Sequence, residues 1–66
     1  MIAYRYHLYV KRMDYDETIN WEHVATFHKA KGARKYMRAN NNFNYRMDTE
    51  YTNGDIDSIE LNRGDY

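Results

Sequence analysis

Residues 21–36, W-E-H-V-A-T-F-H-K-A-K-G-A-R-K-Y, predict a strand that leads directly into a helix. Two sets of side chains alternate in the first half, the two-residue period of a strand: Trp21, His23, Ala25 and Phe27 against Glu22, Val24 and Thr26. After Phe27 the spacing changes to three and four residues, which is the period of a helix. One arc of this helix is formed by Ala30, Ala33, Tyr36, Met37 and Asn40.

The opposite arc of the helix carries only basic side chains: Lys31, Arg34, Lys35 and Arg38. The helix is poorly capped at its start, because His28 and Lys29 stand where Ser, Thr, Asp or Asn would cap it. Gly32 weakens it by roughly 1 kcal/mol relative to Ala. We expect Asn40, Asn41 and Asn42 to end it, since Asn tolerates the left-handed conformation.

Three further segments show the period of strands. In residues 2–11 the even positions are expected to face the core: Ile2, Tyr4, Tyr6, Leu8 and Val10. Residues 43–51 and 55–61 alternate in the same way, and Met13 to Asn20 is expected to be a loop. The prediction is one α+β domain over residues 1–66, ββαββ, with a four-stranded antiparallel sheet and one helix packed on one face. Its elements are strands 2–11 and 21–27, helix 29–41, and strands 43–51 and 55–61.

Asn53-Gly54 is the strongest hairpin signal in the chain. A two-residue turn would place Met47 opposite Glu60, which mismatches the faces of the sheet. A three-residue loop, 52–54, with Gly54 in the left-handed conformation places Met47 opposite Ile59. We therefore predict the three-residue loop, although it leaves Ile56 on the polar face.

The composition limits the class of protein. Sixty-six residues form one small domain, whose core is marginal unless something else supports it. The chain has no cysteine, which excludes disulfides and thiolate metal sites, and its eight tyrosines supply aromatic packing. Arg5 and His7 interrupt the first ten residues, so we expect neither a signal peptide nor a membrane span. The expected location is the cytoplasm of a bacterial cell, and a homodimer is one way to supplement the core.

Charge is divided unevenly along the chain, although the total is zero. Residues 1–46 hold nine basic against four acidic side chains, an excess of five positive charges. Residues 47–66 hold one basic against six acidic side chains, an excess of five negative charges. Such a division bears on binding partners and not on the fold.

No pattern indicates catalysis, a metal or a cofactor. His7, His23 and His28 are the only candidate imidazole ligands or bases. If Tyr6 and Ala25 both face the core, His7 and His23 point to opposite faces and cannot meet. A pocket for paired acid–base carboxylates is more than 66 residues can readily enclose.

Part of the opening stretch resembles the strand-to-helix unit of AP2-type domains and of the arm-binding domains of tyrosine integrases. The matching positions are Trp21, Thr26, Phe27, Ala33 and Tyr36. In those families the unit follows a three-stranded sheet that reads DNA through arginine-rich residues, which this chain lacks, and here two strands also follow the helix. We therefore interpret the resemblance as a sign of how a strand leads into a helix, and not of DNA reading. Ala25 stands where they have glycine, and Lys29 where they have a capping threonine. As a whole, the short, cysteine-free, tyrosine- and asparagine-rich chain is similar to small phage accessory proteins, which implies a protein that binds a host factor.

We therefore expect a non-enzymatic binding protein, phage-encoded, that inhibits or modulates a host protein. Its candidate contact residues are Lys31, Arg34, Lys35 and Arg38 on the helix and Asp48, Glu50, Asp55 and Asp57 on the last hairpin. One alternative is a small nucleic-acid-binding module that uses Arg5, Lys11, Arg12, Lys31, Arg34, Lys35 and Arg38. Another is a subunit of a larger assembly. A membrane is not an expected partner.

Overall fold

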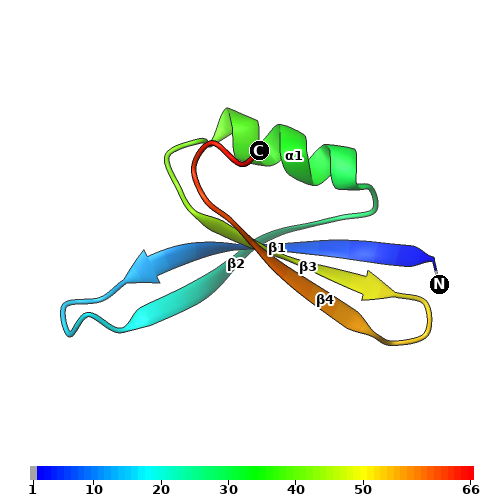
Figure 1. Ribbon diagram of the computed structural model, residues 1–66, viewed down its shortest axis with the longest axis horizontal. Helices are drawn as coiled ribbons and strands as arrows, with labels where there is room; N and C mark the ends of the chain where they lie inside the picture. Colours follow the sequence, from blue (N-terminus) through cyan, green and yellow to red (C-terminus); the bar gives the residue numbers. More distant parts are fainter. Residues whose placement is uncertain (1) are drawn as a thin grey trace.

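The computed structural model describes residues 2–66 and confirms the ββαββ prediction (Figure 1). Its elements are β1 Ala3–Met13, β2 Ile19–Phe27, α1 Ala30–Ala39, β3 Tyr45–Tyr51 and β4 Ile56–Leu61. The strands form one antiparallel sheet in the order β2-β1-β3-β4, so β1 lies at its centre between the two hairpins. No helix in the described residues is long and apolar enough to cross a membrane.

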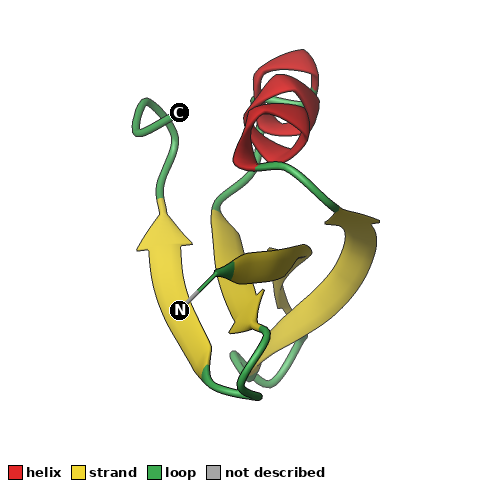
Figure 2. Ribbon diagram, turned by 90° about the vertical axis from the view of Figure 1, so that its right-hand side faces the viewer, coloured by secondary structure: helices red, strands yellow, loops and turns green. Residues whose placement is uncertain are grey.

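The helix covers one face of the sheet and leaves the other face open (Figure 2). The β1–β2 and β3–β4 hairpins extend in opposite directions from the crossing point under α1, which makes the molecule elongated, with principal extents of 39, 23 and 17 Å. The core lies between α1 and the middle of the sheet. It consists of Leu8, Val10, Ala33, Met37 and Tyr45, each at most 3 % exposed.

The expectation that every even position of the first strand faces the core is wrong for Ile2 and Tyr4. They are 73 % and 43 % exposed, respectively, whereas Leu8 is fully buried. The register of β1 against β3 shifts between Ala3 and Arg5, which breaks the alternation there. The Arg5 guanidinium lies 4.5 Å from the centroid of the Tyr4 ring and donates to its hydroxyl at 2.7 Å. This end of β1 also extends beyond the short helix.

A second irregularity changes the phase of β2. The register of β1 against β2 shifts between Leu8 and Tyr9, so Ala25 pairs with Leu8 but His23 pairs with Tyr9. The extra residue, Val24, packs against the core. A bulge of this kind moves the residues beyond it to the other face of the sheet. The prediction that His7 and His23 lie on opposite faces is therefore wrong: their ring centroids are 6.2 Å apart.

The predicted register of the last hairpin is confirmed. Met47 pairs with Ile59, and the Tyr51 amide donates to the Asp55 carbonyl at 2.9 Å across the three-residue loop. Gly54 has a φ of 91°, the left-handed conformation that the loop requires. Ile56 is 59 % exposed, as this register implies.

The first hairpin is tighter than predicted. Both strands extend toward a turn at 14–18, where the Asp14 amide donates to the Thr18 carbonyl at 3.0 Å. The Thr18 amide donates to the Asp16 carboxylate, and hydrogen bonding by Thr18 lowers the pKa of Asp16. Glu17 takes a φ of 64° at the corner. Side-chain hydrogen bonds therefore close a turn that has no glycine.

The helix begins at Ala30 without a side-chain cap on Lys29, as expected. The asparagines end the helix, as predicted, with Asn40 as its C-cap, but the expected left-handed conformation is wrong, because Asn40 has a φ of −127°. Instead, the Asn40 side chain donates to the Tyr36 carbonyl at 3.0 Å, and the Asn40 carbonyl accepts from the Tyr45 hydroxyl at 2.5 Å. The helix end is thus fixed by a tertiary contact with β3.

Candidate functional site

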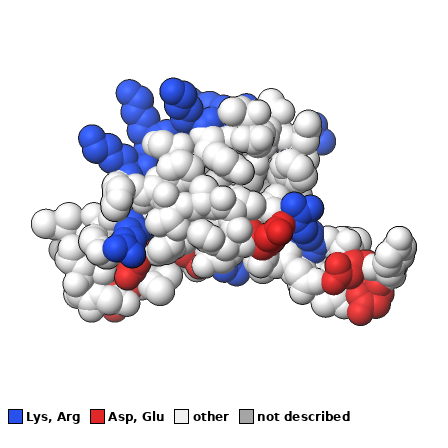
Figure 3. Space-filling model, turned by 180° about the vertical axis from the view of Figure 1, so that it is seen from behind, with Lys and Arg blue, Asp and Glu red and all other residues white. Residues whose placement is uncertain are grey.

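Four basic side chains of α1 are exposed on one side of the helix, and we call the surface that carries them the basic helix face: Lys31, Arg34, Lys35 and Arg38. Figure 3 shows basic side chains projecting into solvent on the helix side of the molecule. They project away from the sheet because Ala33 and Met37, on the opposite arc, are fully buried against it. In the described residues, none of the four makes an ion pair or a hydrogen bond. Four like charges within ten residues repel one another, so the isolated protein gains no stability from this arrangement.

The acidic residues of the last hairpin do not form one surface. Asp48 and Glu50 lie on the open face of the sheet, Asp55 is in the turn, and Asp57 lies on the helix side, opposite Thr49. Most of them have partners within the protein. Asp48 accepts from Arg46 at 3.1 Å and from the Ser58 hydroxyl at 2.6 Å. A hydrogen bond with Asp57, with partial burial, raises the pKa of Tyr51.

The cations of the nucleic-acid alternative are also divided between faces. Arg5 and Lys11 occupy the open face, in phase with His7 and Tyr9. Arg12 lies on the helix side, where it lines a small cavity beside Val10 and forms an ion pair with Glu22. Arg5 and Lys11 therefore cannot contact the same stretch of nucleic acid as the basic helix face unless the nucleic-acid strand wraps around the sheet.

The open face of the sheet carries a hydrogen-bond network that the sequence analysis missed. The Thr26 hydroxyl lies 3.0 Å from Nδ1 of His7 and 2.8 Å from Nε2 of His23, and Nε2 of His7 lies 2.9 Å from a Glu50 oxygen. A Glu50 carboxylate only accepts, so Nε2 of a neutral His7 carries the proton. Nδ1 then accepts from the Thr26 hydroxyl, whose oxygen accepts from His23.

This line of carboxylate, imidazole and hydroxyl has the chemistry of a nucleophile with its base. The Thr26 hydroxyl, however, is engaged by two imidazoles at once. It lies on an exposed strand, and a reacting carbonyl would also need oxyanion donors in a water-excluded site. We therefore interpret the network as a structural connection from β2 across β1 to β3.

Arg46 extends the network to the aromatic residues of the open face. Its guanidinium lies 4.3 Å from the centroid of Tyr9 and 5.3 Å from that of Trp21, while it donates to Asp48. Tyr9 also packs edge-on against His23 at 5.3 Å. Cation–π contacts and these hydrogen bonds hold the open face together without a second hydrophobic core. Val24 is an apolar residue that alternates with the polar Glu22 and Thr26. This was the one sequence signal of the bulge that brings the residues of the open face together.

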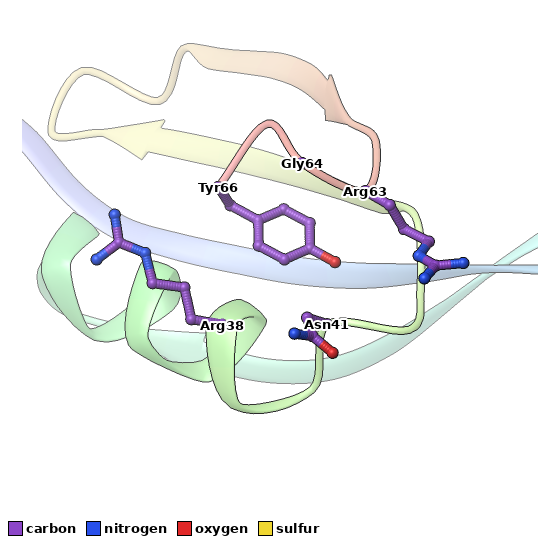
Figure 4. Close-up of a pocket in the computed structure, with 5 residues that line it drawn as sticks. All are labelled: Arg38, Asn41, Arg63, Gly64 and Tyr66. Atoms are coloured by element: carbon purple, nitrogen blue, oxygen red, sulfur yellow. The ribbon is translucent and has the colours of Figure 1, made fainter.

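A second hollow lies between the end of α1 and the C-terminal segment 62–66 (Figure 4). Tyr66 packs edge-on against Tyr45 at 5.5 Å and donates to the Phe43 carbonyl at 2.8 Å, which holds this segment against the fold. Arg38 and Arg63 lie on either side of the Tyr66 ring and point away from each other (Figure 4). Their guanidinium groups therefore do not converge on a single anion.

In the described residues, no group of three or more His, Asp or Glu side chains is arranged to hold a metal ion. Burial, together with the neighbouring Tyr66 and Tyr36, raises the pKa of Tyr45, which is a consequence of core packing.

Comparison with protein-family models, with curated proteins and with solved structures finds no match. Function is therefore inferred from the composition and size of the chain and from the chemistry of its surface.

Proposed function

We propose that this protein is a non-enzymatic binding protein that docks its basic helix face on an acidic surface of a partner protein. The observation that carries the proposal is the set of four exposed cations on one helix that have no counter-charge within the described fold. Most acidic side chains of the last hairpin, in contrast, already have internal partners. Charge complementarity with a partner raises the association rate and selects against basic surfaces.

The partner that we propose is a protein of a bacterial host cell, which this protein inhibits or modulates in the cytoplasm. The support is the resemblance of the composition to small phage accessory proteins, and the size of the domain, which favours binding over catalysis. The nucleic-acid alternative is weaker, because its cations lie on different faces and a duplex could touch only the helical four at once.

The test is an affinity pull-down of the tagged protein from bacterial lysate, with and without nuclease, read by mass spectrometry. The variant Lys31→Gln/Lys35→Gln is compared with Arg5→Gln/Lys11→Gln, which removes two charges from the open face. We expect the helix variant to bind the partner about tenfold more weakly, which corresponds to about 1.4 kcal/mol, and the control variant to bind normally.

Equal recovery with both variants would remove the basic helix face from the proposal. Recovery that disappears with nuclease would support nucleic acid as the partner. Recovery of the protein's own kind alone would point to a subunit of an assembly.

A further inference from the structure

A shallow apolar groove of about 410 Å³ lies beside the first turns of α1. It is lined by Phe27, His28, Lys29, Lys31, Gly32 and Lys35. Phe27 forms its apolar floor, because the ring is only partly buried where β2 passes into the helix. The other contacts of this ring are with the core and with Tyr36, whose centroid is 5.9 Å away.

Gly32 keeps this groove open. A Cβ atom at position 32 would lie 3.1 Å from Cδ1 of Phe27, closer than ordinary van der Waals contact. Any side chain there would press on the ring and occupy the space above it. A glycine costs helix stability, roughly 1 kcal/mol relative to alanine, and here it leaves an aromatic ring accessible from the helix surface.

Cations surround the apolar floor on the solvent side. Lys31 and Lys35 are one helical turn apart and belong to the basic helix face, and Lys29 stands at the start of the helix. None of the three has an ion-pair partner in the described residues. The helix start has neither a side-chain cap nor an acidic residue in the first turn. The Gly32 amide donates to the Lys29 carbonyl at 3.1 Å, and the dipole of the helix adds to the positive potential at this end.

We propose that this groove binds an acidic peptide segment of the partner protein, with one apolar side chain on the Phe27 ring and carboxylates on the flanking lysines. This inference rests on the proposed function and names the chemistry that the basic helix face recognises. An apolar centre with a charged rim is the usual arrangement at protein interfaces, where a buried anchor supplies most of the affinity. The anchor explains what the cations alone do not, namely how one acidic surface is chosen among many.

A peptide fits this groove better than a nucleic acid does. A base could stack its flat face on the Phe27 ring, but proteins that bind single strands stack successive bases on several aromatic rings, and no other Phe, Tyr or Trp lines this groove. A single aliphatic or phenyl side chain needs only one such ring. Single carboxylates also match Lys31 and Lys35, which are separate point charges one turn apart.

The test uses the isotope-labelled full chain in NMR titrations with three probes. The first is a capped pentapeptide with phenylalanine between two pairs of glutamates, the second has serine in place of the phenylalanine, and the third is a thymidine pentanucleotide. We expect the phenylalanine peptide to shift the amide signals of residues 27–35 and to bind about tenfold more tightly than the serine peptide. Equal affinity of the two peptides, shifts confined to other regions, or a preference for the nucleotide would overturn the inference.

Two variants separate the anchor from the charges. Gly32→Ala is expected to abolish the preference for phenylalanine while the serine peptide still binds, because the methyl group would lie 3.1 Å from Cδ1 of Phe27 and obstruct access to the ring, and the lysines remain. Lys35→Gln changes an exposed position and is expected to lower the affinity for both peptides by a similar factor. This variant keeps the test valid if Gly32→Ala disturbs the fold. The variant Lys31→Gln/Lys35→Gln could lose the lysate partner while the phenylalanine and serine peptides bind the wild-type protein with equal affinity. That result would support the proposed function and contradict the peptide-binding role of the groove.

Discussion

Replacing Tyr45 by phenylalanine tests how the helix end is fixed. Tyr45 is 1 % exposed, and its hydroxyl donates to the Asn40 carbonyl at 2.5 Å. An intramolecular hydrogen bond contributes about 0.5–1.5 kcal/mol net, and a buried carbonyl left without a donor adds to the loss. Asn40 is exposed, so water can replace the donor. We therefore expect Tyr45→Phe to lower the free energy of unfolding at pH 7 by about 1 kcal/mol, or Tm by about 4–8 °C.

The same variant should also change how the free energy of unfolding depends on pH in alkaline solution. Burial, together with Tyr66 and Tyr36, raises the pKa of Tyr45 in the folded protein above its unfolded value near 10. The folded state thus favours the neutral phenol. The stability linked to this proton is complete below pH of about 10 and is lost as the pH rises through the folded pKa. Tyr45→Phe lacks the group, so the difference between the two proteins should shrink above pH 10.

The assay is urea unfolding followed by Trp21 fluorescence between pH 7 and pH 11. Tyr36→Phe is the matched control, because it removes a hydroxyl from the same cluster that makes no hydrogen bond in the described residues. The control should change the free energy of unfolding by less than about 0.5 kcal/mol. A Tyr45→Phe protein as stable as the wild type at pH 7, or a difference that persists unchanged through pH 11, would refute this account of the helix end.

Substitutions at three further positions probe the core, the open face and the hairpin. Leu8→Ala removes a fully buried side chain and should cost about 2–5 kcal/mol, enough to leave much of so small a domain unfolded in circular dichroism at 37 °C. Thr26→Val keeps the shape but removes the hydroxyl shared by His7 and His23, and should cost about 1 kcal/mol in urea unfolding while changing the ring signals of both histidines in NMR. Unchanged ring signals would contradict the network. Gly54→Ala should cost about 1 kcal/mol, read as a lower Tm, because of its φ of 91° and not because of crowding, since an added Cβ meets nothing within 4 Å. Gly54→Asn should lose less, and a loss equal to that of alanine would argue against a purely conformational cost.

Much of this fold follows from local patterns, because hydrophobic period and turn chemistry act over a few residues. The four strands were predicted from their two-residue alternation, and the helix from the change of period after Phe27. The register of the last hairpin was predicted from the alternation around Met47 and from Asn53-Gly54. The basic helix face followed in the same way, since spacings of three and four residues place side chains on one arc. The lack of a side-chain cap at Lys29 was also predicted correctly, because capping depends on the residue at one position.

Tertiary structure decided the rest. The bulge at Val24 inverted the faces of Trp21 and His23, and a strict two-residue period cannot reveal an extra residue in one strand. The end of the helix depends on a hydrogen bond from Tyr45, which arrives from β3. The division of the acidic residues between faces and the groove over Phe27 likewise arise where distant segments meet. Sequence period determines which side chains share a face of one element, but the pairing of elements determines which faces meet and which charges remain unpaired.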